Sequence, residues 1–273
     1  MTARVRVTVF DTGFCIARAS LIARGTGWHN VQCHAPAFLL QHPTHGSMLF
    51  DTGYAPRLAA AFAHWPERLY KYVTPTTFGT PVVQHLAGIG VTAAQVSMVI
   101  VSHLHADHVG GLRDFPLAQF VVSVAALELQ QRVYGIGAVR RGIVQSMFPD
   151  DFTARAHVIH AFDHDPLPHL GQTHDLFGDG SIRLMPLPGH ARGQIGALVR
   201  SASGDLLLCA DGAWTSQAWR EVRPPHWMTG PMQDDMSALH DTLAALRAFA
   251  AARPDVTILP AHCPETLRWR GDP

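Results

Sequence analysis

The sequence predicts an α/β fold in a single domain, and three observations support this prediction. The 273 residues suffice for one large α/β domain, or for two small ones, with a sizeable core. Runs typical of β-strands occur along the chain together with segments whose apolar residues recur at helical spacing. No Gly/Ser-rich linker divides the chain, so we expect residues 1–273 to form one domain.

The first part of the chain predicts three strands and a helix. Residues 4–10 alternate polar and apolar side chains, as a half-buried strand does. Residues 34–42 and 47–50 read as two further strands, joined by a Pro-Thr-His-Gly turn. Residues 81–89 carry apolar side chains at helical spacing, and Gly90 ends this predicted helix.

A central β-branched run, residues 99–101, predicts a buried strand that leads into a histidine-rich loop. The loop holds His103, His105, Asp107 and His108. A single histidine is usually a core or surface residue, but His and Asp are the ligands of zinc and similar metals. Four of them in this order at the end of a strand predict a loop that offers ligands to two neighbouring metal ions.

The second part of the chain predicts more strands and one long amphipathic helix, residues 233–252. The predicted strands cover residues 120–124, 155–162, 182–187, 206–210 and 256–260, and residues 125–133 are predicted to be helical. Three of these strands end close to a chemically active side chain, namely His190, Asp211 and His262. Since each follows a strand, one edge of a sheet can bring them together with the loop.

These residues carry a resemblance to a known family. The run from His103 to His108 matches the HxHxDH signature of the metallo-β-lactamase superfamily of metallohydrolases. Asp51-Thr-Gly after the strand 47–50, Gly-His190, Asp211-Gly and Ala-His262 resemble its other motifs. The resemblance implies an αββα sandwich, in which two sheets pack together with helices outside.

The resemblance also implies a complete binuclear metal centre with two divalent ions, zinc by default, although manganese, iron or cobalt stay open. By this resemblance the first metal is bound by His103, His105 and His190, the second by Asp107, His108 and His262, and Asp211 bridges the two. Asp51 is implied to orient the ligand loop. Asp107 and Asp211 are the implied catalytic carboxylates of a hydrolase in which a bridging hydroxide attacks a lactone or ester carbonyl.

In size and layout the chain is similar to the acyl-homoserine lactone lactonases, which are quorum-quenching enzymes. Those lactonases carry a Tyr three residues after the bridging Asp, whereas this chain has Trp214, whose N–H donates a hydrogen bond but is not an acid. An aryl ester or organophosphate hydrolase, a thioesterase of the same superfamily, and a non-catalytic metal-bearing ligand sensor are the alternatives.

Aromatic segments at residues 62–78 and 147–152 are candidates for a pocket that holds an apolar part of a small-molecule substrate. The alternatives are a dimer contact, which would make the protein a homodimer, or packing onto the core. The candidate pocket residues are Phe62, Trp65, Tyr70, Met147, Phe148 and Trp214.

Composition argues against other classes of partner. The formal net charge is zero and no basic run is present, so nucleic acid is not an expected partner. No signal peptide or apolar run of membrane-spanning length is evident, so we expect no membrane partner. The four cysteines are far apart in sequence, which is typical of reduced thiols in a cytoplasmic protein.

Overall fold

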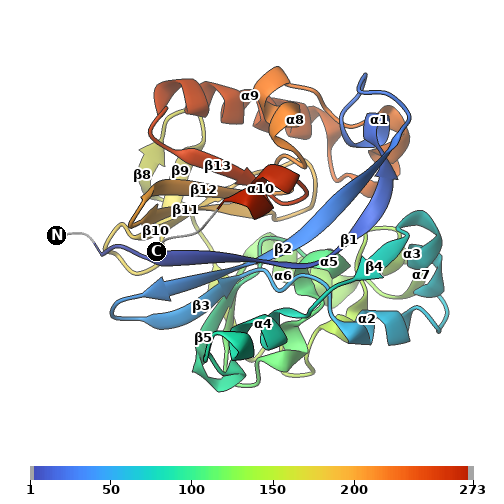
Figure 1. The fold of residues 1–273 in the computed structure, drawn as a ribbon, viewed down its shortest axis with the longest axis horizontal. Helices are drawn as coiled ribbons and strands as arrows, with labels where there is room; N and C mark the ends of the chain where they lie inside the picture. The colour runs from blue at the N-terminus through green and yellow to red at the C-terminus, as the bar shows by residue number, and fades with distance from the viewer. Residues whose placement is uncertain (1–2, 270–273) are drawn as a thin grey trace.

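The computed structural model describes residues 3–269, which form two mixed β-sheets with helices on their outer faces (Figure 1). The predicted α/β class and the αββα arrangement are therefore confirmed. The outer ends of the predicted domain, residues 1–2 and 270–273, lie outside the described residues.

The first sheet has seven strands in the order β4-β1-β2-β3-β5-β6-β7. Strands β1, β2, β3 and β4 pair antiparallel where they meet, whereas β3, β5, β6 and β7 run parallel. The strands are β1 (Arg6–Arg18), β2 (Asn30–His42), β3 (Gly46–Phe50), β4 (Thr76–Phe78), β5 (Val96–Ile100), β6 (Gln119–Ser123) and β7 (Ala156–Ile159).

The second sheet has six strands in the order β13-β12-β11-β10-β9-β8. Its neighbours are antiparallel except for β12 and β13, which run parallel. The strands are β8 (His164–Leu167), β9 (Gly171–Asp175), β10 (Ile182–Pro186), β11 (Ile195–Ser201), β12 (Gly204–Ala210) and β13 (Thr257–Pro260).

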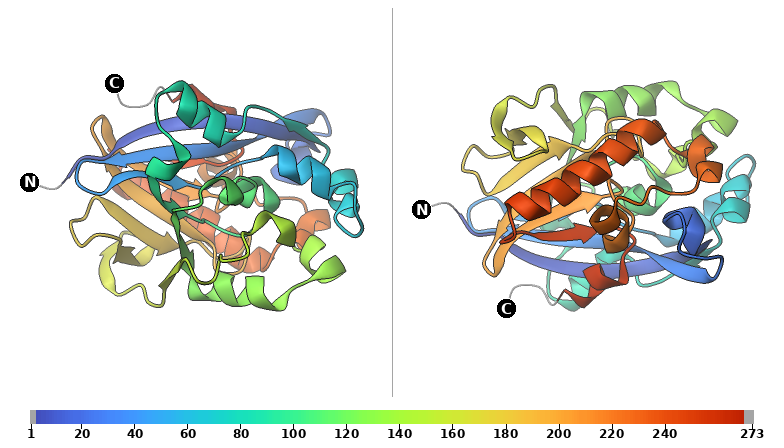
Figure 2. Two further views of the ribbon diagram at one scale, coloured as in Figure 1. Left: turned by 90° about the horizontal axis from the view of Figure 1, so that it is seen from below. Right: turned by 90° about the horizontal axis from the view of Figure 1, so that it is seen from above.

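The helices cover the outer faces of the two sheets. In Figure 2, α9 crosses the outer face of the second sheet, and α2 and α4 lie on the opposite side of the molecule. The helices are α1 (Ala19–Ile22), α2 (Pro56–Ala61), α3 (Arg68–Val73), α4 (Val82–Gly88), α5 (Ala106–Val109), α6 (Val124–Arg132), α7 (Gly135–Val139), α8 (Ser216–Glu221), α9 (Met236–Ala252) and α10 (Pro264–Arg268). No helix in residues 3–269 is both long and apolar enough to span a membrane.

Three buried apolar clusters separate the four layers. The middle cluster lies between the sheets and joins residues such as Leu40 of β2 and Leu208 of β12. A second cluster joins the first sheet to the helices outside it and includes Val99 of β5 and Leu86 of α4. The third packs the second sheet against α9 through residues such as Leu246. Each sheet thus buries both faces, which matches the apolar runs in its central strands.

Most predicted elements are present with shifted ends, and one region differs in kind. The predicted strand 4–10 continues to Arg18 as β1, with a break in register between Asp11 and Phe14. The irregular segment 54–80 contains α2, α3 and the short edge strand β4. Each of these elements is too short to show a clear apolar periodicity in the sequence. Which of their side chains are buried depends on packing beneath the first sheet.

Candidate metal centre

Seven His and Asp side chains meet where strands of both sheets end. His103, His105, Asp107 and His108 follow β5, in the loop that enters the single-turn helix α5. His190 follows β10, Asp211 follows β12 and His262 follows β13. We call these seven residues the His/Asp cluster. The sequence predicted this convergence from the position of each residue after a strand.

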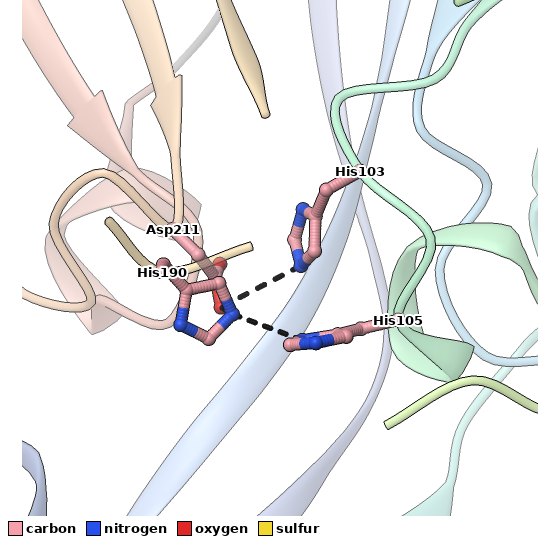
Figure 3. Close-up of side chains that lie close together, drawn as sticks. All are labelled: His103, His105, His190 and Asp211. Carbon is pink, nitrogen blue, oxygen red and sulfur yellow. Dashed lines mark hydrogen bonds and ion pairs between the residues drawn. The ribbon is translucent and has the colours of Figure 1, made fainter. Parts of the chain in front are cut away.

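One group within the cluster consists of His103, His105, His190 and Asp211, all of them drawn in Figure 3. A ligand atom from each lies within 4.8 Å of the others. His190 Nε2 is 2.9 Å from His105 Nδ1 and 3.1 Å from Asp211 Oδ2. Three imidazoles and a carboxylate at these separations form a donor set suited to a zinc-like cation.

A second group consists of Asp107, His108 and His262, whose ligand atoms also lie within 4.8 Å of one another. Asp211 lies between the two groups. Its Oδ2 is 3.1 Å from His262 Nε2, and its Oδ1 is 3.3 Å from His108 Nε2. A single carboxylate therefore faces histidines of both groups, as a bridging ligand must.

Unsatisfied polar atoms test whether a cation fits this site. His103 Nε2, His108 Nε2 and Asp211 Oδ1 are buried and have no hydrogen-bond partner within residues 3–269. Burying polar atoms without partners costs about 1–3 kcal/mol each. A cation held by these atoms would satisfy all three, so the side chains of the cluster fit two metal ions.

Partners behind the cluster orient four of its histidines. Asp51 Oδ2 accepts hydrogen bonds from His108 Nδ1 at 2.8 Å and from the Ser102 hydroxyl at 2.7 Å. Gln233 Oε1 lies 2.8 Å from His190 Nδ1, and the His34 carbonyl accepts from His262 Nδ1 at 2.6 Å. Each contact leaves Nε2 of that histidine directed into the cluster, which is the usual arrangement of metal-binding histidines.

The partners of the fourth histidine, His103, and of Asp51 show what sequence reasoning missed. Ser102 Oγ lies 3.0 Å from His103 Nδ1, and the Ser102 amide donates to Asp51 Oδ1 at 2.8 Å. Of these orienting residues, only Asp51 was predicted. Ser102 is adjacent to the histidine loop and offered a weak signal, whereas Gln233 and the His34 carbonyl offered none because their roles depend on tertiary contacts.

Electrostatics divide the cluster into two kinds of histidine. Burial lowers the pKa of His103 and His105 well below the usual value, and neighbouring histidines lower it further. Burial alone would also lower the pKa of His262, but the charges of Asp211 and Asp107 outweigh it and raise that pKa to about 9. Burial would raise the pKa of Asp211, yet the surrounding histidines hold it well below its usual value.

Trp214 was predicted to contact the substrate, but its side chain contacts the His/Asp cluster. Its indole Nε1 donates a hydrogen bond of 2.7 Å to Asp211 Oδ2. Its ring lies edge-on to the rings of His190 and His262, with centroids 5.4 and 6.3 Å away. The N–H is thus used to hold the central carboxylate.

Two cavities flank the cluster. The first has a volume of about 320 Å³ and is lined by His105 and His190, by apolar residues and by several arginines. The second has a volume of about 640 Å³ and is lined by His262 and His34 together with residues around α1, such as Ile22. Both volumes lie in the range of small-molecule sites.

The other predicted pocket residues lie elsewhere. Phe62, Tyr70, Met147 and Phe148 are buried in the apolar cluster beneath the first sheet, and none of them lines either cavity described above. Trp65 is 57% exposed and lines neither cavity. Phe62, Tyr70, Met147 and Phe148 therefore take the alternative role of core packing, whereas Trp65 does not.

Comparisons with known proteins agree with this geometry. Residues 31–262 match the model of the metallo-beta-lactamase superfamily. The chain is 28% identical over 240 residues to the N-acyl homoserine lactonase AttM of Azorhizobium caulinodans, covering 84% of this chain and 82% of that relative. It is 29% identical over 238 residues to AttM of Rhizobium radiobacter, with the same two coverages.

A solved structure shares the fold over nearly the whole chain. It is an N-acyl homoserine lactone hydrolase with the product N-hexanoyl-L-homoserine bound at its catalytic metal centre. The TM-score is 0.74 at 17% identity, and the match covers 98% of this chain and 96% of the other.

Proposed function

Because the chain belongs to the metallo-β-lactamase superfamily, we propose that it is a metal-dependent hydrolase that opens the ring of N-acyl homoserine lactones. The observation that carries this proposal is the His/Asp cluster, in which Asp211 lies between two groups of histidines beside open cavities. The names of the AttM relatives supply the substrate class. In an organism that signals with such lactones, the activity would be quorum quenching.

The proposal assigns two divalent ions to the cluster. Zinc is preferred over manganese, iron or cobalt because the donors of the cluster are rich in histidine. His103, His105 and His190 would hold one ion, Asp107, His108 and His262 the other, and Asp211 both. When bound, the ions supply a nucleophile from water at neutral pH and polarise the substrate carbonyl.

The side chains of this chain then perform the remaining tasks. Asp211 is fixed by Trp214 and neighbouring histidines, so it keeps the two halves of the site at one separation. Asp107 has a carboxylate oxygen 3.6 Å from His262 Nε2 at the edge of the cluster, where it can receive a proton and deliver it to the leaving oxygen of the opened ring. Trp214 does not supply this proton, because an indole N–H is not an acid and is already donated to Asp211.

The finer sequence predictions belong to the same proposal. Residues 1–273 would act as one hydrolase domain on a small molecule with an apolar part, in the cytoplasm. Trp65 and Tyr72, which are 57% and 78% exposed, support a homodimer contact in the segment 62–78.

A hydrolysis screen with metal-reconstituted protein tests the proposal. The substrates are acyl-homoserine lactones of short to long chain, a simple lactone, an aryl ester and a phosphotriester. We expect the acyl lactones to have the highest kcat/KM. Rapid turnover of the ester or phosphotriester with slow lactone turnover would show that the protein belongs to one of the alternative hydrolase classes. Binding without turnover would indicate a ligand sensor.

A further inference from the structure

Three arginines line the first cavity beside the His/Asp cluster. They are Arg140 and Arg141, which follow α7, and Arg192, which comes two residues after His190. All three are exposed to solvent. Asp234 is the single acidic residue among the described residues that line this cavity, so its lining carries an excess of positive charge.

These arginines lack acidic partners, whereas several other arginines of the described residues have them. In residues 3–269, no carboxylate forms an ion pair with Arg140, Arg141 or Arg192, and a side-chain hydrogen bond of Arg141 goes to the Gly137 carbonyl. Eight other arginines do form such pairs, namely Arg4, Arg57, Arg113, Arg132, Arg155, Arg220, Arg223 and Arg253. One of these, Arg223, lines the second cavity, where Glu221 neutralises it.

Buried apolar side chains form part of the lining of the first cavity. Leu104, Ile143 and Ala191 line it and are at most 8% exposed. The cavity therefore offers apolar side chains and His105 and His190, together with three arginines that have no acidic partner in the described part of the chain. A ligand that matches both features has a short aliphatic segment that ends in an anion.

We propose that this arginine cavity binds the acyl end of the substrate, and that this end carries a terminal carboxylate. The inference rests on the proposed hydrolysis of acyl lactones. It adds a preference for an acyl chain that ends in a carboxylate. The planar guanidinium group binds a carboxylate through two parallel hydrogen bonds. Unpaired positive charge at this cavity also raises the association rate of an anionic substrate.

A matched pair of substrates isolates the carboxylate. N-adipoyl-homoserine lactone and N-hexanoyl-homoserine lactone have acyl chains of six carbons and differ in the terminal carboxylate. We expect the protein with its metals to have a kcat/KM about tenfold or more higher for the adipoyl substrate, mainly through a lower KM. Raising the ionic strength should reduce this preference, because salt screens exposed charges.

Substitution of the arginines tests the assignment to this cavity. In the double variant Arg140→Gln/Arg192→Gln, we expect kcat/KM for the adipoyl lactone to fall about 10–100-fold, with a much smaller fall for the hexanoyl lactone. Arg247→Gln is the matched control, since Arg247 is exposed on α9 and lines neither cavity. An equal fall for both lactones would overturn the proposal.

A binding measurement separates this proposal from the proposed lactonase function. Calorimetry would compare the ring-opened N-adipoyl-homoserine with N-hexanoyl-homoserine, which requires no turnover. Tighter binding of the adipoyl compound that is lost in the double variant supports the arginine cavity even when no lactone is hydrolysed. Equal affinities would overturn it even when the lactones are hydrolysed rapidly.

Discussion

The indole Nε1 of Trp214 donates a 2.7 Å hydrogen bond to Oδ2 of Asp211, the carboxylate that faces both groups of the His/Asp cluster. The donor fixes the carboxylate without adding charge. It thus acts on the proposed bridging ligand from behind, in the way that outer partners orient metal ligands.

We expect Trp214→Phe to weaken metal binding by about 10–100-fold, because the ring is kept while the donor to Asp211 is lost. Metal content after titration with a chelator measures the change. Trp219→Phe is the control, since Trp219 Nε1 is buried without a hydrogen-bond partner in the described part of the chain. Equal metal affinity in the two variants would remove Trp214 from its positioning role.

A second prediction concerns Gly142, which lies against a proposed ligand. A Cβ at this position would be 2.7 Å from Cδ2 of His105, and the residue has a φ of +70°. We expect Gly142→Ala to displace the imidazole, to lower the number of metals bound per chain and to reduce activity. Elemental analysis of the purified variant measures the metal.

Gly135→Ala is the matched control for backbone strain. Gly135 has a φ of +56°, but nothing lies within 4 Å of its Cβ position. Both substitutions should cost about 1–2 kcal/mol of stability from the left-handed backbone. Only Gly142→Ala should lose metal, and equal metal content in both variants would contradict the contact with His105.

The sequence predicted that the residues of the cluster come together because each lies in a short motif after a strand, and these motifs resemble those of one superfamily. His190 and His262 are 72 residues apart, yet the resemblance to the superfamily motifs, together with the strand before each residue, placed both at the same sheet edge. The pocket was predicted poorly for the opposite reason. Phe62 and Phe148 carry only composition as a signal, and composition does not distinguish a ring that lines a cavity from one that packs in the core.

Partners that act through tertiary contacts had no local signal either. Gln233 contacts His190 across 43 residues of sequence, and Arg192 and Arg140 line the same cavity only because the fold brings them there. The role of Trp214 was predicted at the substrate, whereas its N–H is directed at Asp211. The direction of a side chain is decided by packing, and a motif fixes only its position along the chain.

A third prediction concerns Asp51, whose carboxylate accepts hydrogen bonds from His108 Nδ1 and from both Ser102 donors. Asp51 has a φ of 58°, a conformation that Asn tolerates well. We expect Asp51→Asn to cost about 1.5–3 kcal/mol of stability and to weaken metal binding, because an amide replaces one of the two acceptors. Denaturant unfolding and chelator titration measure the two effects.

The control for Asp51 is a similar pair far from the cluster. Asp179 Oδ2 lies 3.1 Å from Nε2 of the buried His42, and Asp179 Oδ1 accepts from the Ser181 amide. Asp179→Asn should reduce stability and leave metal affinity as it is. A variant at Asp51 that loses only stability, like this control, would show that Asp51 has no influence on the metals.

The last prediction concerns the metal-free protein and pH. The charges of Asp211 and Asp107 overcome burial and raise the pKa of His262 to about 9, above the usual 6.5. A raised pKa means that the protonated imidazole stabilises the fold fully below pH 6.5 and that this stabilisation is lost as the pH rises through 9. A bound metal requires neutral His262, so metal binding near pH 7.5 must release a proton.

We therefore expect the Tm of the chelator-treated protein to fall between pH 6.5 and 9, while the increase in Tm on adding zinc grows over the same interval. Calorimetric titration of zinc in two buffers with different ionisation enthalpies would count the protons released. His108 should contribute in the same direction, because burial lowers its pKa but the nearby carboxylates raise it further. Zinc binding without proton release at pH 7.5 would contradict a protonated His262 in the metal-free cluster. It would also contradict the conclusion that the carboxylates raise the pKa of His262 more than burial lowers it.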